Sequence, residues 1–288
     1  MPAKKRLQPS NIWNPIVPLI STSSRDMPLK PAAMVFQLGE IWREQGLEVH
    51  VARDFHPSAD LCILHHDRTF VSPADIPPAP AGVRVLNGAA NDISKRRYSS
   101  LLVTPDSDWT GPVILKTNLN HFGAPERRDG KTVGGELRKK LATLSWRLAR
   151  RLPPKDYPVL DGIGVVPDWV WRNEDLIVEK FLPERHEGLY CLRGWIFFGA
   201  ESYGYRMFAT HPLVKVKSIV SHEYLDQPPP EPILRKREEM GFDFGKFDYV
   251  VHDGQAILLD ANKTPSLVRS ARSERVMRLA RGVQPFLK

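Results

Sequence analysis

A strand–turn–strand pattern near the end of the chain constrains its fold more than any other feature. Two apolar runs, Phe247–Val251 and Ala256–Leu259, flank the tetrapeptide His252-Asp253-Gly254-Gln255. Asp-Gly between two apolar runs predicts a tight β-hairpin, because glycine adopts positive φ at little cost. We therefore expect an antiparallel pair of strands here.

Three oxygen-bearing side chains border this hairpin. Asp260 and Asn262 lie two residues apart on the second strand, so they share one face. Antiparallel pairing is able to bring Asp248, from the first strand, onto that face. Carboxylate and amide oxygens are the hard ligands that Mg²⁺ prefers, and Mg²⁺ usually shares its coordination sphere with phosphates. Asp and Asn are also frequent turn and capping residues, so a purely structural role stays open at this point.

Length and composition indicate a globular protein of more than one part. The chain has 288 residues, of which 42% are hydrophobic, which fits two or three compact subdomains that share a core. Cys62 and Cys191 have no metal-ligand spacing and suggest no disulfide framework. No apolar run is long enough to span a membrane, and the first residues lack the apolar core of a signal peptide. We expect a cytoplasmic protein without a membrane partner.

The formal net charge of +8 leaves three interpretations. A basic surface suits nucleic acid, polyanionic ligands or simple solvation. The sequence carries no aromatic-basic recognition motif and no zinc signature that would support the first. We do not expect nucleic acid as a partner.

The chain divides into three predicted parts: an N-terminal α/β unit over 1–94, a middle block over 95–175 and a C-terminal block over 176–288. In the first, short apolar runs alternate with a predicted helix over residues 31–45, which indicates a parallel sheet. In the middle block, a predicted strand over 112–116 precedes a polar loop. A leucine stripe at helical spacing follows, which predicts core packing or a subunit contact, so a homo-oligomer is among the expected partners. It comprises Leu137, Leu141, Leu144 and Leu148.

The C-terminal block reads mostly as strands. Predicted strands cover 176–182, 189–198 and 202–208, and a short helix covers 232–241. The hairpin comes next, followed by a basic helix that carries arginines between 269 and 281.

Three weaker signals point to a nucleotide. Gly130-Lys131-Thr132 after a strand approaches a P-loop, but the preceding glycine is Gly123, which is the wrong spacing. Lys95 stands at the junction of the first two parts and Lys116 ends an apolar strand, where a buried ammonium needs a partner such as a phosphate. The segment Glu179, Lys180, Phe181 and Leu182 is able to offer backbone groups and apolar side chains to adenine. Each signal also has an ordinary structural explanation.

The order of these features resembles the ATP-grasp superfamily, in its branch of ribosomal-protein glutamate ligases and glutathione synthetase-like enzymes. The resemblance covers about residues 83–266 and is strongest over 247–266, where Leu258–Ser266 looks like the acidic-x-Asn-x-x-Pro ending of the family. It implies an α/β (α+β) fold, with a small N-terminal α/β domain (a pre-ATP-grasp domain) before the two ATP-grasp subdomains.

The resemblance also implies roles for individual residues. Lys95 and Lys116 match the lysines that hold ATP phosphates, and Glu179 to Leu182 matches the adenine hinge. Glu187 stands where the family places a ribose-binding acid. Arg193 looks like the arginine of a D-x-R strand that faces the transferring phosphate. The metal ligands that the family implies are Asp248, Asp260 and Asn262.

The function implied is a magnesium- and ATP-dependent carboxylate–amine ligase that acts through an acyl-phosphate. Its substrates are then a small-molecule or peptide carboxylate and an amine, and its cofactors are ATP and Mg²⁺. Two departures are evident: Cys191 replaces the aspartate of D-x-R, and the loop after Lys116 is long and carries Arg127-Arg128. Two alternatives therefore stay open, a small-molecule kinase on the same fold and a nucleotide-binding module without turnover.

Overall fold

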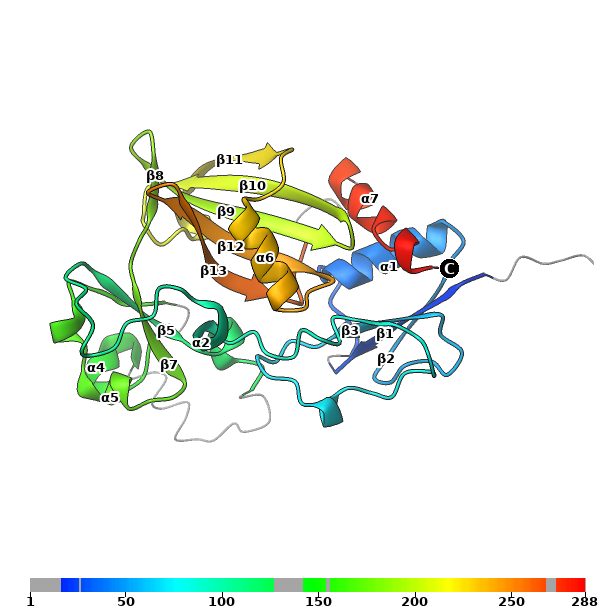
Figure 1. Ribbon diagram of the computed structural model, residues 1–288, viewed down its shortest axis with the longest axis horizontal. Coiled ribbons are helices and arrows are strands. Elements are labelled where there is room, and N and C mark those ends of the chain that lie inside the picture. Colours follow the sequence, from blue (N-terminus) through cyan, green and yellow to red (C-terminus); the bar gives the residue numbers. More distant parts are fainter. Residues whose placement is uncertain (1–16, 26, 127–141, 154–155, 268–272, 288) are drawn as a thin grey trace, which may run out of the picture.

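The computed structural model describes residues 17–25, 27–126, 142–153, 156–267 and 273–287. These residues form three β-sheets that succeed one another along the chain (Figure 1). None of the helices in this part of the chain is both long and apolar enough to cross a bilayer.

The first sheet has four parallel strands in the order β2-β1-β3-β4. The strands are β1 (Leu19–Ser24), β2 (Glu48–Ala52), β3 (Leu61–His65) and β4 (Val85–Leu86), and α1 (Met34–Glu44) connects the first two. Every residue of β3 is buried, as expected for the interior of a parallel sheet covered on its faces. The predicted parallel α/β unit is confirmed.

The second sheet is small and antiparallel, in the order β6-β5-β7. Its strands are β5 (Val113–Thr117), β6 (Val159–Leu160) and β7 (Leu176–Lys180), and the short helices α2 (Lys95–Tyr98), α4 (Trp146–Ala149) and α5 (Asp168–Trp171) flank it. The predicted boundary at residue 175 assigned β7 to the C-terminal block, whereas β7 pairs with β5. The three-part division itself stays a prediction.

The leucine stripe does not form a core in the described residues. Leu144 and Leu148 are 85% and 87% exposed, and α4 has only four residues. Leu137 and Leu141 lie outside the described residues, as does Gly130-Lys131-Thr132, whose spacing does not match a P-loop. The expectation of core packing is therefore wrong for the two described leucines, whereas a subunit contact stays a prediction.

The third sheet is the largest, with the order β11-β10-β9-β12-β13 and with β8 paired to β9. The strands are β8 (Glu184–His186), β9 (Leu189–Phe198), β10 (Glu201–Ala209), β11 (Ile219–Leu225), β12 (Phe244–His252) and β13 (Gln255–Asn262). The predicted hairpin is confirmed: His252 pairs with Gln255, and Asp253 and Gly254 both have positive φ. This is the backbone that a two-residue hairpin turn requires.

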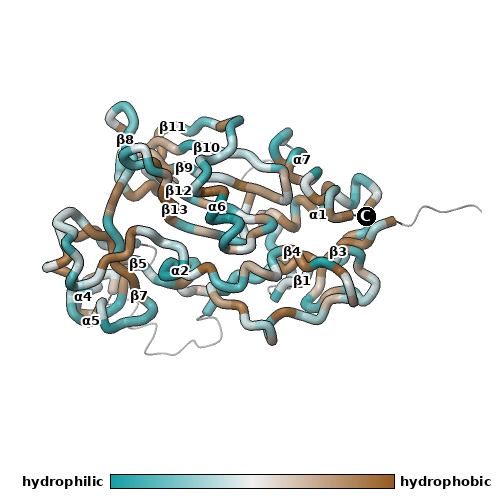
Figure 2. Tube along the Cα trace, viewed as in Figure 1, coloured by the Kyte–Doolittle hydropathy of each residue, from teal (hydrophilic) through white to brown (hydrophobic). Residues whose placement is uncertain are grey.

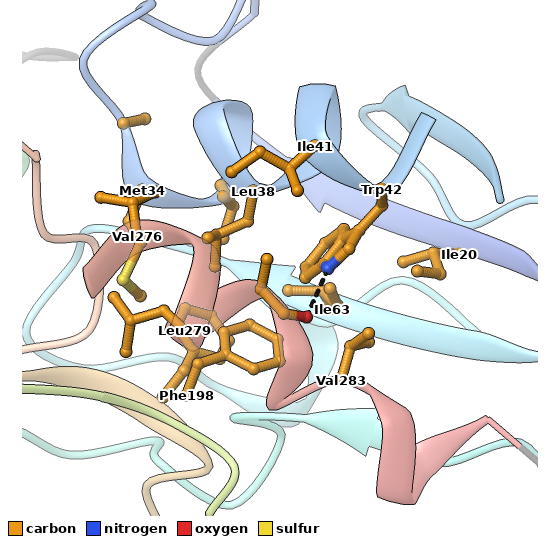
Figure 3. Packing of buried hydrophobic residues seen from close by; sticks show 14 of the residues in the cluster. Ile20, Met34, Leu38, Ile41, Trp42, Ile63, Phe198, Val276, Leu279 and Val283 are labelled. Atoms are coloured by element: carbon orange, nitrogen blue, oxygen red, sulfur yellow. Dashed lines mark hydrogen bonds between the residues drawn. The ribbon is translucent and has the colours of Figure 1, made fainter. Parts of the chain in front are cut away.

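Helices cover both faces of the large sheet. Alternate residues Trp195 and Phe197 of β9 pack with α6 (Glu231–Glu239), while Ile196 and Phe198 belong to the cluster that contains α1 and α7 (Glu274–Arg281). Figure 3 shows α1 and α7 side by side over Phe198, where Trp42 Nε1 donates a hydrogen bond of 2.8 Å to the Ala280 carbonyl. Figure 2 shows apolar residues gathered along the strands and hydrophilic residues along α6.

Candidate active site

A pocket of about 400 Å³ lies between the small sheet and the large sheet. Residues of β5 and β7 line it on one side, and residues of β9, β12 and β13 line it on the other. Its wall changes from apolar to charged along the hairpin strands, from Val250 and Leu259 to Asp248 and Asp260. An elongated amphipathic ligand matches this change of polarity.

The apolar half of the pocket is a slot between the two sheets. Its walls share five residues with one hydrophobic cluster, and these are Leu101, Leu182, Leu192, Val250 and Leu259. Branched apolar side chains from opposite walls are suited to hold a flat heteroaromatic ring. One of the five, Leu182, belongs to the segment Glu179–Leu182 that the sequence predicts to contact adenine.

The predicted hinge segment borders the slot, but Glu179 has a different role from its neighbours. Lys180, Phe181 and Leu182 line the pocket. The amides of Lys180 and Phe181 donate to the carbonyls of Leu101 (2.8 Å) and Pro112 (2.9 Å), which fixes the course of the segment. The Glu179 side chain is 1% exposed and does not line the pocket.

Lys116 and Glu179 form a buried ion pair at the border of the pocket. Lys116 Nζ lies 2.7 Å from Glu179 Oε2, and the two side chains are 10% and 1% exposed. Lys116 lines the pocket as well, so the pair holds its ammonium at the charged half. Tyr157 stands beside it, and burial raises the pKa of its hydroxyl to about 12, so that it stays protonated.

The hairpin register brings the predicted metal ligands onto one face. Asp248 pairs directly with Asp260, and Lys246 pairs with Asn262 in the next row of the same face. Asp248 and Asp260 both line the pocket. A register shift after Asp248 places an extra residue in β13, between Leu258 and Asp260.

Two lysines balance the charge of the aspartates. Lys95 Nζ lies 3.1 Å from Asp260 Oδ1, and Lys246 Nζ lies 2.9 Å from Asp248 Oδ2. Burial acts to raise the pKa of the Asp260 carboxyl, but the ammonium groups of Lys95, Lys116 and Lys246 hold it below its usual range. Burial raises the pKa of the Asp248 carboxyl, since the opposing effect of Lys246 is smaller.

The donor set fits a magnesium ion that is completed by phosphate oxygens. Asp248 Oδ1 is buried and has no hydrogen-bond partner among the described residues, so it keeps free lone pairs. Asn262 Oδ1 accepts a 2.8 Å bond from the Thr264 amide, which fixes the orientation of the side chain. Within the described ranges, no three His, Cys, Asp or Glu side chains are grouped as a metal site. Two carboxylates and one amide agree with a metal that takes its other ligands from ATP and water.

Four predicted site residues do not line the pocket: Glu179, as described above, Asn262, Glu187 and Arg193. Glu187 is exposed at the tip of the β8–β9 turn with φ of 48°, and it does not line the pocket. Arg193 pairs with Tyr249, one residue out of step with the Gly194–Asp248 pair, so its side chain lies on the opposite face of the sheet from Asp248. The predicted contacts of Glu187 with ribose and of Arg193 with the phosphate are not supported by these positions.

Arg193 instead stabilises the sheet. Its guanidinium donates two bonds of 3.0 Å and one of 2.6 Å to the buried carboxylate of Glu184. Glu184 Oε2 also accepts a 2.6 Å bond from the Val251 amide. The pair therefore joins β8, β9 and β12 just behind the slot.

Several pocket residues were missed by the sequence reasoning. Phe122 stacks on Tyr157 with ring centroids 4.4 Å apart, and Lys215 bonds Asp156 at 2.6 Å, with all four residues lining the pocket. They come from loops far apart in the sequence, and no local pattern marks them. Lys246 did carry a signal, because it stands two residues before Asp248, immediately ahead of the predicted strand that begins at Phe247.

Comparison with known proteins finds matches to this chain in structure but not in sequence. No family model matches the chain, and no curated protein matches its sequence. A RimK-domain ATP-grasp protein from Sphaerobacter thermophilus superposes with a TM-score of 0.50 at 12% identity, over 93% of this chain and 99% of that one. The ATP-grasp ligase PsnB, solved with a phosphomimetic variant of its minimal precursor, Mg and ADP, gives 0.53 at 13% identity, over 94% and 99%.

A second PsnB structure, with the precursor peptide PsnA2 and AMPPNP, gives a TM-score of 0.51 at 13% identity, over 94% and 98% of the two chains. These likenesses extend over nearly the whole length of each protein. Because the sequence identities are only 12–13%, these likenesses establish the fold and nothing beyond it. The chain has the ATP-grasp fold, with a small α/β unit at its N-terminal side.

Proposed function

We propose that this protein is a magnesium- and ATP-dependent ligase that joins a carboxylate to an amine. One observation carries the proposal: the cross-strand pair Asp248–Asp260 lies beside Lys95 and Lys116, at the charged end of an apolar slot between two sheets. Charged groups of both signs at the end of such a slot suit a nucleotide whose phosphates reach a metal ion. PsnB, which shares the fold, was solved with ADP and Mg and with AMPPNP.

Each half of the pocket has a role in this proposal. Leu101, Leu192 and Leu259 hold adenine, and the Phe181–Leu182 segment aligns it. Lys95 and Lys116 neutralise phosphate oxygens, while Asp248, Asp260 and Asn262 hold the metal. When bound, the magnesium ion neutralises charge on the phosphates and aligns the terminal one for transfer.

The reaction proceeds in two balanced steps. A substrate carboxylate oxygen bonds to the γ-phosphorus while the bond to the β–γ bridging oxygen breaks, giving ADP and an acyl-phosphate. The amine then attacks the carbonyl carbon, inorganic phosphate leaves, and the amine proton passes to phosphate or solvent. Lys116, which Glu179 holds in place, stabilises the charge that develops on the transferring group.

The substrates proposed are a small-molecule or peptide carboxylate and an amine. The PsnB structures contain a precursor peptide, which makes peptides a first choice for testing. The experiment is a screen of amino acids and short peptides for ADP release with Mg-ATP, with hydroxylamine added in parallel. Release of ADP together with a hydroxamate supports the ligase. ADP release that yields a phosphorylated hydroxyl and no hydroxamate indicates a kinase, and ATP binding without turnover across the screen indicates a binding module.

A further inference from the structure

A lysine and a tyrosine stand beside the metal pair on the same face of the large sheet. The strand registers align Asp260, Asp248, Gly194 and Tyr205 in one row across β13, β12, β9 and β10. Lys246 occupies the next row of this face, and its Nζ lies 6.0 Å from the centroid of the Tyr205 ring. These two donors therefore border Asp248.

Gly194 makes this arrangement possible. A Cβ atom at position 194 would overlap the ring of Tyr205, including its hydroxyl-bearing end. The ring therefore lies directly on the backbone of β9, on the row that leads to Asp248. Any other residue at position 194 would push the hydroxyl of Tyr205 away from Lys246.

The position of Lys246 along β12 relates it to the phosphoryl acceptor. Val250 lines the apolar slot and Asp248 lies at the charged end of the pocket. Lys246 follows in the same direction, about 7 Å beyond Asp248 at two residues of strand rise. If adenine occupies the slot and the phosphates reach Asp248, then the group that receives the terminal phosphate lies toward Lys246.

The charge of Lys246 constrains what that group is. Its side chain is 24% exposed, and its counter-ion is Asp248 Oδ2 at 2.9 Å. A metal ion at Asp248 would share that carboxylate, leaving the largely buried ammonium short of negative charge. A second anion restores the balance, because an ammonium without a partner in such a place is costly. A neutral hydroxyl group carries no charge and would not restore this balance.

We propose that Lys246 and Tyr205 bind the carboxylate that accepts the phosphoryl group. The Lys246 ammonium and the Tyr205 hydroxyl both donate hydrogen bonds to one oxygen of the substrate carboxylate. The other oxygen stays free to attack the phosphorus. This inference rests on the proposed function, and it selects a carboxylate over an alcohol as the acceptor. Both residues are positioning residues for the substrate.

Acetate is the probe for this subsite. The protein is saturated with Mg-AMPPNP, and acetate binding is followed by saturation-transfer NMR of its methyl group. Wild type is expected to bind acetate and not the neutral isostere acetamide. Lys246→Met should weaken acetate at least about tenfold, and Tyr205→Phe, which keeps every charge, about threefold to fivefold.

Matched variants separate the subsite from general effects of charge. Lys236→Met removes a lysine whose ammonium pairs with Glu239 at 2.8 Å on α6, and it should leave acetate binding unchanged. Lys246→Arg should retain binding within about threefold, because the cation is kept. AMPPNP affinity is measured for every variant, and Tyr205→Phe decides the outcome if Lys246→Met no longer binds AMPPNP.

The outcomes distinguish this inference from the function on which it rests. Acetate binding that is equal in wild type, Lys246→Met and Tyr205→Phe overturns the subsite. So does wild type that binds Mg-AMPPNP but no acetate, and in that case the nucleotide site stands. Wild type that binds no AMPPNP overturns the proposed function itself.

Discussion

Replacing Lys116 by methionine should damage both the fold and the nucleotide site, and the two effects are separable. Lys116 Nζ lies 2.7 Å from Glu179 Oε2, with side-chain exposures of only 10% and 1%. Removing the ammonium leaves the Glu179 carboxylate buried without its cation. Loss of one partner of a buried pair costs about 3–5 kcal/mol of unfolding free energy.

A second substitution isolates the phosphate contact. In Lys116→Met/Glu179→Gln, no charge stays uncompensated, so most of the lost unfolding free energy should return. ATP affinity should not return, because the phosphates still lack the ammonium. A charge-assisted hydrogen bond contributes about 1.5–3 kcal/mol, so binding should weaken by about 10- to 150-fold.

Urea denaturation followed by circular dichroism measures the first effect, and isothermal titration with AMPPNP and Mg²⁺ measures the second. Glu179→Gln alone is the control for changes in the hinge strand. If the double variant regains wild-type AMPPNP affinity, Lys116 is not a phosphate ligand. If Lys116→Met is destabilised by less than about 1 kcal/mol, the pair is not buried as the structure describes.

Three further predictions address other parts of the molecule. Arg193→Met should lower the free energy of unfolding by about 3–5 kcal/mol, because the Glu184 carboxylate stays buried without its cation. The AMPPNP affinity of the folded protein should stay within about threefold of wild type. A large loss of affinity would show that Arg193 does contact the nucleotide. Leu192→Ala should weaken AMPPNP binding about fivefold to tenfold, because an apolar contact with adenine is lost. Unchanged affinity would show that adenine does not bind in the slot. Burial, and then the charge of Lys263, lower the pKa of His66 to about 4 from 6.5. Because the unfolded chain takes up the His66 proton more readily than the folded protein, the free energy of unfolding is highest above pH 6.5 and falls as the pH drops toward 4. Between pH 8 and pH 5, wild type should therefore lose about 2 kcal/mol more unfolding free energy than His66→Gln, as measured by urea titration. Equal losses in the two proteins would refute the lowered pKa.

The hairpin could be predicted from sequence because its determinants are local. Asp253-Gly254 fixes the turn, and the alternation of Asp248, Asp260 and Asn262 with apolar residues fixes the face. The same logic did not extend to Arg193. Whether its side chain shares a face with Asp248 depends on the register between β9 and β12, and no short-range pattern encodes that register.

Other errors have the same physical origin. Strand β11 was not predicted, since it is an edge strand whose middle residues, Ser221, His222 and Glu223, are exposed and polar. Glu179 stands in the predicted hinge, but its pairing with Lys116 depends on the contact between β5 and β7. Side-chain positions that depend on pairing between strands far apart in the sequence cannot be derived from local sequence patterns.

The most direct test of the account is the magnesium dependence of AMPPNP binding in wild type and in Asp260→Asn. The variant keeps the shape of the side chain but removes one negative charge from the metal site. Isothermal titration is run with Mg²⁺ and with EDTA for both proteins. We predict that Mg²⁺ tightens AMPPNP binding to wild type by at least about tenfold and changes binding to Asp260→Asn by less than about threefold. Wild type that binds no AMPPNP, or an equal gain from Mg²⁺ in both proteins, would contradict the assignment of the metal and nucleotide site.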